Sequence, residues 1–152
     1  MRLLAKLLYT INKIRWRITK PLTLGVRLLL IKDLTVLLVK HTYTNYWFLV
    51  GGAVEKNETL EQAVRREAQE EIGAQLKDLT LFGVYSNFIE SKSDHIILFS
   101  CNDFTVTGTT NHEIAKFRFF DLDKLPEDIS PATRRRIQEY LSHEAKPSVT
   151  MW

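Results

Sequence analysis

The spacing of apolar residues changes period along the chain, and these changes divide it into predicted helices and strands. Helical spacing occurs over residues 3–18, over 59–72 and from 131 to about 143. Runs rich in Val, Leu, Ile and aromatic residues predict strands, which cover residues 23–31, 35–40, 46–50, 79–87, 95–101 and 116–120. Helices interleaved with hairpin-like strands predict an α/β fold in which helices flank a mixed sheet.

The first 20 residues form a basic, amphipathic segment. They hold six of the 21 Lys and Arg residues and no acid, so the rest of the chain has 15 basic against 18 acidic residues. Leu and Ile recur on one face of the predicted helix 3–18, and Pro21 ends the pattern. This helix either packs on its own domain or on a second copy of the chain, or it lies on an anionic membrane surface.

Size and composition indicate one soluble domain. The chain has 152 residues, of which 45% are hydrophobic and 26% charged, and no run of eighteen apolar residues occurs. Cys101 is the only cysteine, which excludes an intrachain disulfide and favours a reducing cytoplasm; its strand-like surroundings predict a core position. We expect the domain to span residues 21–145, with residues 146–152 as a flexible tail.

The helix predicted over residues 59–72 has well-defined ends. Thr59 and Gln62 form a capping box at its start. Gly73 occupies the position at which a left-handed residue ends many helices. The helix should therefore begin and end where the sequence places these signals.

The apolar face of this helix does not continue along its full length. Leu60 and Val64 set a buried stripe, and Glu67 and Glu71 fall on the same line, with Glu70 at its edge. Acids at this spacing repel one another. Such crowding is costly unless a positive charge lies among the acids. The alternative explanation of these three glutamates is an acidic face exposed to solvent.

Two sources of positive charge are available. Arg66 lies four residues before Glu70, but one guanidinium cannot neutralise three acids. A bound cation can, and clustered carboxylates are hard oxygen ligands that suit Mg²⁺ or Mn²⁺ better than zinc. The preceding Gly51 and Gly52 would let the backbone approach such an ion and offer a carbonyl ligand.

The segment Gly52–Ala74 resembles the Nudix box, G-x₅-E-x₇-R-E-U-x-E-E-x-G-U, in which U is apolar. Every fixed position of the motif is filled, by Gly52, Glu58, Arg66, Glu67, Glu70, Glu71 and Gly73. The resemblance implies an α/β/α sandwich with a mixed central sheet. It also implies a pyrophosphohydrolase that acts on acid anhydrides and cuts a nucleoside diphosphate joined to another group, with Mg²⁺ or Mn²⁺ as cofactor.

The resemblance also implies roles for individual residues. Glu67, Glu70 and Glu71 are expected to bind the metal, together with the carbonyl of Gly51. Arg66 is expected to orient the glutamates through salt bridges.

The general base in this family is a glutamate of the box or one in a later loop. Here Glu67 and Glu113 are the two candidates, and both stay open. Glu70 is expected to be essential for turnover.

Candidates for substrate binding rest on weaker signals. Arg27, Lys40 and His41 lie on strands before the box and could contact phosphates, although a solvated strand edge explains them equally well. Trp47 or Phe88 could stack on a base, although an aromatic residue in a strand is more often part of the core.

The sequence leaves the substrate open. Ile89 stands where ADP-ribose-hydrolysing members tend to carry proline, and residues 90–92 lack the tyrosine typical of dinucleoside-polyphosphate hydrolases. We expect a nucleotide, a nucleotide sugar or a related molecule as substrate, with no specific nucleic acid as partner. The alternative is a catalytically silent module that senses nucleotides or ADP-ribose.

Overall fold

The structure is a computed structural model that describes residue 19 and residues 21–88, 91–108, 110–142 and 147–152. The predicted N-terminal helix 3–18 lies outside the described residues, so its packing stays a prediction. No helix in the described ranges is long and apolar enough to cross a membrane.

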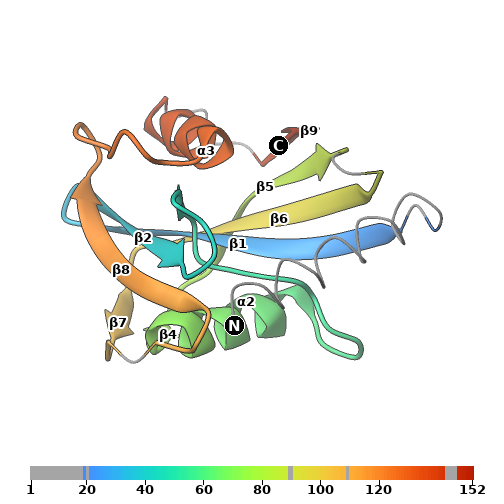
Figure 1. The fold of residues 1–152 in the computed structure, drawn as a ribbon, viewed down its shortest axis with the longest axis horizontal. Coiled ribbons are helices and arrows are strands. Elements are labelled where there is room, and N and C mark those ends of the chain that lie inside the picture. Colours follow the sequence, from blue (N-terminus) through green and yellow to red (C-terminus); the bar gives the residue numbers. More distant parts are fainter. Residues whose placement is uncertain (1–18, 20, 89–90, 109, 143–146) are drawn as a thin grey trace.

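A mixed sheet forms the centre of the described domain (Figure 1). Its strands follow the order β3-β2-β1-β6-β5-β9, and β8 also pairs with β2. The pairings β1–β6 and β5–β9 are parallel and the others antiparallel. The strands are β1 (Leu22–Lys32), β2 (Thr35–His41), β3 (Trp47–Phe48), β5 (Thr80–Asn87), β6 (Ser93–Cys101), β8 (Ile114–Asp121) and β9 (Ser148–Met151).

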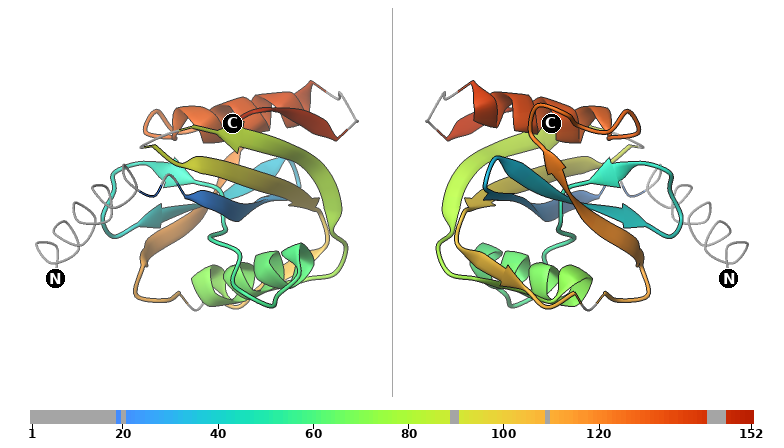
Figure 2. Two further views of the ribbon diagram at one scale, coloured as in Figure 1. Left: turned by 90° about the vertical axis from the view of Figure 1, so that its right-hand side faces the viewer. Right: turned by 90° about the vertical axis from the view of Figure 1, so that its left-hand side faces the viewer.

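Two helices cover opposite faces of this sheet (Figure 2). They are α2 (Leu60–Ile72) and α3 (Pro131–Leu141). A small antiparallel pair, β4 (Ala74–Leu76) and β7 (Phe104–Val106), lies next to α2. These layers confirm the predicted α/β/α sandwich with a mixed central sheet.

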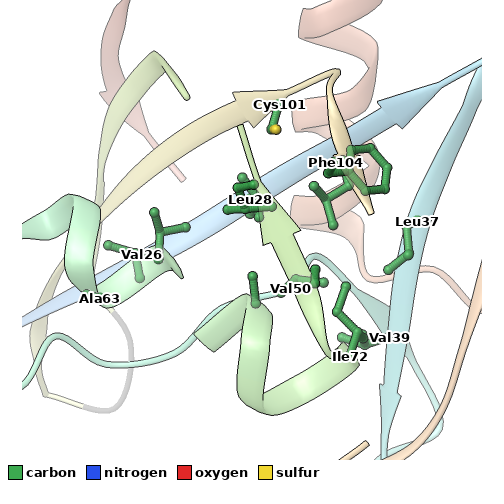
Figure 3. Packing of buried hydrophobic residues seen from close by; sticks show 14 of the residues in the cluster. Val26, Leu28, Leu37, Val39, Val50, Ala63, Ile72, Cys101 and Phe104 are labelled. Atoms are coloured by element: carbon green, nitrogen blue, oxygen red, sulfur yellow. The ribbon is translucent and has the colours of Figure 1, made fainter. Parts of the chain in front are cut away.

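The alternation of β1 explains why both faces of the sheet are covered. Leu28 and Leu30 belong to the core under α2, which Figure 3 shows in detail, whereas Leu29 and Ile31 belong to the core under α3. A strand that is apolar on both sides needs a layer on each face. Cys101 is buried in the α2-side core, as predicted.

The ends of α2 confirm their sequence signals. The Thr59 hydroxyl accepts from the N–H of Gln62, the Gln62 side chain accepts from the N–H of Thr59, and Gly73 is left-handed with a φ of 64°. The buried stripe, however, begins later than predicted. Leu60 is 37% exposed, because the first turn of the helix extends past the core, and Ala63 and Val64 are the first buried residues.

Two local expectations were wrong. Residues 102–112, for which the sequence predicted neither helix nor strand, contain β7, which pairs with β4 beyond the end of α2. The predicted flexible tail contains β9, which adds a parallel strand at the edge of β5. Trp152 then packs against Tyr85, with 5.5 Å between ring centroids, and its N–H donates to the Ser86 carbonyl at 3.0 Å. Long-range partners decide these segments, since three or four residues carry little periodicity.

Candidate active site

The backbone at Gly51 crosses β1 in a conformation that requires glycine. The carbonyls of the two flanking residues accept hydrogen bonds from β1, Val50 from Leu28 and Gly52 from Val26, both at 2.9 Å. Gly51 has a φ of 131°, and a Cβ there would lie 2.2 Å from the Val26 carbonyl oxygen. The peptide groups of Gly51 are left out of this pairing with β1.

Gly52 makes room for a carboxylate. A Cβ at this position would lie 2.4 Å from Oε1 of Glu67 and 2.8 Å from Oε2. The missing side chain therefore lets the Glu67 carboxylate rest against the backbone. Both glycines of the pair thus serve close approach, Gly51 to β1 and Gly52 to the Glu67 carboxylate, whereas the approach of this backbone to an ion stays a prediction.

Glu71 is a buried acid that meets the Gly51 backbone. The residue is only 3% exposed, and its Oε2 atom accepts a hydrogen bond from the Gly51 N–H at 3.0 Å. Burial raises the pKa of Glu71 to about 7. The Gly51 hydrogen bond and the Arg27 charge oppose this shift in pKa, whereas the charges of Glu67 and Glu113 add to it.

Glu67 lies one turn earlier on the same helix and is also shielded. Its side chain is 13% exposed, and Oε1 accepts from Arg66 at 2.8 Å. Burial raises the pKa of Glu67, and the hydrogen bond from Arg66 works against that rise. A carboxylate with a raised pKa is a better proton acceptor than an exposed one.

Arg66 links the acids of the motif. Its guanidinium contacts Glu58 and Glu67 at 2.8 Å and Glu70 at 3.3 Å, and it donates to the Ala53 carbonyl at 3.1 Å. The hydrogen bond from Arg66 lowers the pKa of Glu58. The guanidinium thus holds three carboxylates, although Glu71 is not among its contacts.

Glu58 lies just before α2 and is one of the fixed residues of the motif. It accepts from the Glu55 N–H at 2.6 Å and pairs with Arg66, so it ties the loop before α2 to the helix. The sequence spacing alone could not show which of several acids Arg66 reaches.

The β2–β8 pairing brings Glu113 to this end of the sheet. His41 is in register with Ile114, and the Thr42 N–H donates to the Glu113 carbonyl at 2.8 Å. Asn111 fixes the turn by accepting from the N–H groups of Glu113 and Ile114. Glu113 is exposed and close enough for its charge to affect the pKa of Glu71.

The predicted substrate residues separate into two groups. Arg27 donates to the carbonyls of Val26 at 2.8 Å and Gly52 at 3.3 Å, so its charge lies beside the glycine pair. Burial, and then the Arg27 charge, lower the pKa of His41. Both residues therefore lie with the acids.

Lys40 and Trp47 lie elsewhere. Trp47 belongs to the core on the α3 side, and the Lys40 ammonium is 5.5 Å from its ring centroid. Lys40 also pairs with Asp128 at 2.6 Å. The structure does not bring these two residues together with the carboxylates. Lys40 is the cross-strand partner of Trp47 in β3, so both lie on the α3 side of the sheet.

Tyr43 belongs to the site but was missed. It follows β2 and stacks on His41, with ring centroids 5.1 Å apart. Burial, and then the charges of Glu113 and Glu71, raise the pKa of its phenol. The only signal in the sequence was the group of aromatic residues before Gly51. Their spacing is irregular, so it could not show which of these residues belongs to the site.

The donor set fits a hard divalent cation. Oxygen atoms of Glu67, Glu70 and Glu71 project from successive turns of one helix, and the Gly51 carbonyl lies outside the β1 pairing. Burial of Glu71 without a cationic side chain in direct contact leaves a charge that an ion would stabilise. Within the described residues, no three His, Cys, Asp or Glu side chains already converge on one point, since Glu67 and Glu70 turn to Arg66.

An α/β/α sandwich with acids and glycines in this arrangement defines a class of protein. The sequence model of the NUDIX domain family matches residues 21–140, and the chain belongs to this family. The resemblance of the segment Gly52–Ala74 to the Nudix box is thereby confirmed.

Individual relatives share about a quarter to a third of their residues with this chain over the matched parts. The chain is 35% identical over 101 residues to a curated ADP-ribose pyrophosphatase from Methanocaldococcus jannaschii, a match that covers 63% of this chain and 60% of that relative. The structure resembles a MutT NUDIX hydrolase from Burkholderia pseudomallei, with a TM-score of 0.70 and 26% identity over 77% of this chain and 96% of the other. It also resembles a MutT protein from Methanosarcina mazei, with a TM-score of 0.66 and 23% identity over 84% and 98% of the two chains.

Proposed function

We propose that this NUDIX family member is a pyrophosphohydrolase that cuts the diphosphate linkage of a nucleoside diphosphate derivative with the help of Mg²⁺ or Mn²⁺. One observation carries the proposal. The acids of α2 lie against a glycine backbone that β1 holds in place, with Glu71 on the Gly51 N–H and Glu67 in the space left by Gly52. An acidic face that served solubility alone would not be buried there.

Glu67, Glu70, Glu71 and the Gly51 carbonyl would hold the metal. A bound divalent ion would neutralise charge on the diphosphate oxygens while water attacks phosphorus. The side chain of Arg66 keeps Glu67 and Glu70 in place through its salt bridges. Arg27, beside Gly52, is the cation placed to meet a phosphate oxygen.

The proton of the attacking water passes to a carboxylate. Glu67 is one acceptor, because burial raises its pKa, and Glu113 is the other, because the β2–β8 pairing places it beside the same site. The water oxygen forms a bond to one phosphorus as the bridging P–O bond breaks. The products are two molecules that each end in a phosphate.

ADP-ribose is the first substrate to test. The M. jannaschii relative is named an ADP-ribose pyrophosphatase, and the match covers 60% of its length. Ile89 departs from the proline that such enzymes tend to carry, so other nucleoside diphosphate sugars and dinucleoside polyphosphates belong in the same assay.

The test measures release of phosphate-ended products from this panel with Mg²⁺, with Mn²⁺ and with a chelator. We expect turnover of at least one compound that is lost with chelator, and a fall of at least about 10³-fold in kcat for Glu70→Gln. Glu61→Gln is the matched control, because Glu61 lies on the same helix and also pairs with an arginine, Arg65, yet points away from the site. Its kcat should equal that of the wild type.

Two results would contradict the proposal. Full activity of Glu70→Gln on the wild type's substrate would remove the metal assignment. Binding of ADP-ribose without release of any product across the panel would favour the alternative of a silent sensing module.

A further inference from the structure

Tyr43 presents an aromatic ring at the rim of the candidate active site. The residue lies in the loop between β2 and β3 and is 68% exposed. One face of its ring stacks on His41, with centroids 5.1 Å apart and planes inclined by 20°. His41 in turn contacts Phe48 at 5.6 Å, and Phe48 packs on the core under α2. His41 therefore covers one face of the Tyr43 ring, and the other face is open to solvent.

The loop that carries Tyr43 is tied to the acidic side of the site. The Thr42 N–H donates to the Glu113 carbonyl at 2.8 Å. The pKa of the Tyr43 phenol is raised, first because its surroundings shield the hydroxyl from water and then because the charges of Glu113 and Glu71 lie near. Arg27 acts on the same phenol and contacts the Gly52 carbonyl. Tyr43 therefore lies within electrostatic range of the residues that would hold the diphosphate, so a group bonded to that diphosphate can reach this loop.

We infer that the open face of Tyr43 is the stacking surface for the nucleobase of the substrate, with His41 as its support. The inference rests on the proposed function and assigns a subsite to it. Stacking of a base on an aromatic side chain contributes about 1–3 kcal/mol and tolerates any base. Burial, and then the Arg27 charge, lower the pKa of His41, which favours the uncharged form of the ring under Tyr43.

The sequence suggested two other rings for stacking, and neither replaces Tyr43. Phe88 is 62% exposed but follows β5 and contacts His95 edge-on, with centroids 6.5 Å apart. The ring of Trp47 is closed. Trp47 is only 5% exposed, and the ammonium groups of Lys40 and Lys116 lie 5.5 and 5.3 Å from its ring centroid. Phe120 packs against it edge-on, with centroids 4.8 Å apart. A ring covered in this way offers no face to a base.

Calorimetric titration of the full chain with ADP and with methyl diphosphate, both with Mg²⁺, tests the inference without requiring turnover. We expect Tyr43→Ala to weaken ADP binding by about 5- to 150-fold, the range that stacking energies give. Its affinity for methyl diphosphate, which has no base, should stay within about twofold of the wild type. Tyr43→Phe should bind ADP like the wild type, because the ring and not the hydroxyl does the stacking.

Tyr46→Ala is the matched control. Tyr46 lies in the same loop and is 51% exposed, yet it has no stacked partner among the ring contacts found in the described residues. Tyr46→Ala should leave the affinities for ADP and for methyl diphosphate unchanged.

The KM for any hydrolysed nucleoside diphosphate derivative should rise in Tyr43→Ala, while kcat changes little.

The outcomes separate the two ideas. Unchanged ADP binding by Tyr43→Ala, an equal loss for ADP and methyl diphosphate, or no ADP binding by the wild type would overturn the stacking role. Tyr43-dependent binding of ADP by a chain that hydrolyses nothing would support that role and overturn the proposed hydrolysis. Hydrolysis with a KM that is unchanged in Tyr43→Ala would support the proposed hydrolysis and overturn the stacking role.

Discussion

Glu71 has an environment that its position in the sequence marks only in part. The stripe set by Val64 leads to Glu71, so the sequence predicted that this acid faces the protein. The structure adds that the Gly51 N–H meets it and that burial raises its pKa to about 7. At this scale, one backbone hydrogen bond offsets only part of the cost of burial, so the pKa of Glu71 stays raised.

The pKa of Glu71 predicts how the stability of chelator-treated protein depends on pH. A carboxyl whose pKa is higher in the folded chain, about 7 against an ordinary 4.5, binds more protons when folded. Its contribution is therefore fully present below pH 4.5 and is lost as the pH rises to 7. The free energy of unfolding should fall by up to about 3 kcal/mol over this window.

Urea unfolding at a series of pH values measures this loss. Glu71→Gln should flatten the curve between pH 4.5 and 7, whereas Glu61→Gln, at an exposed position of the same helix, should leave its slope unchanged. A slope that persists in Glu71→Gln would show that another group titrates.

The helix α2 acts as one element that carries the acids. Its N-terminal cap fixes where the helix begins, and the buried face from Ala63 to Ile72 fixes its rotation on the sheet. The buried face therefore holds Glu67 against Gly52 and Glu71 against Gly51.

The capping box offers a test at this scale. Thr59→Ala should lower the free energy of unfolding by about 1 kcal/mol, because the Gln62 N–H loses its acceptor. Thr59→Ser keeps a hydroxyl and should restore most of that stability. Because burial of Ala63 and Val64 holds the helix in place, kcat should change less than about threefold in either variant. A loss of activity without loss of stability would mean that the hydroxyl acts in the site.

The whole molecule is closed at one edge by its C-terminal residues. β9 covers β5, and Trp152 packs beside Tyr85 and the buried Arg136, whose guanidinium lies 4.2 Å from the Tyr85 ring centroid. Arg135 donates to the Trp152 carbonyl at 2.8 Å. Residues 147–152 are thus part of the fold.

Deletion of residues 147–152 should lower the free energy of unfolding by about 2–4 kcal/mol, because it exposes Tyr85 and the edge of β5. Val149→Ser is the control, since Val149 is 84% exposed and its loss should cost less than about 0.5 kcal/mol. Chemical unfolding followed by circular dichroism measures both. Equal stability of the deleted and full chains would show that the strand contributes nothing to the fold.

Local sequence patterns were sufficient for much of the fold. The strands β1 and β2, the helix α2 with both ends, and the start of α3 at residue 131 all agree with their predictions, because each is specified by residues close by in the sequence. The acids of α2 were recognisable for the same reason, since their spacing alone places Glu67 and Glu71 on one side of the helix.

Pairings between distant segments decided the remainder. Glu113 reaches the site through the register of β8 on β2, and Tyr43 through its stack on His41, neither of which leaves a periodic trace. Lys40 and His41 are adjacent in sequence but serve opposite faces of the sheet. The short strands β4, β7 and β9 exist only because a partner strand satisfies their backbone groups. Local periodicity carries no information about such partners, because the free energy that selects them comes from residues tens of positions away.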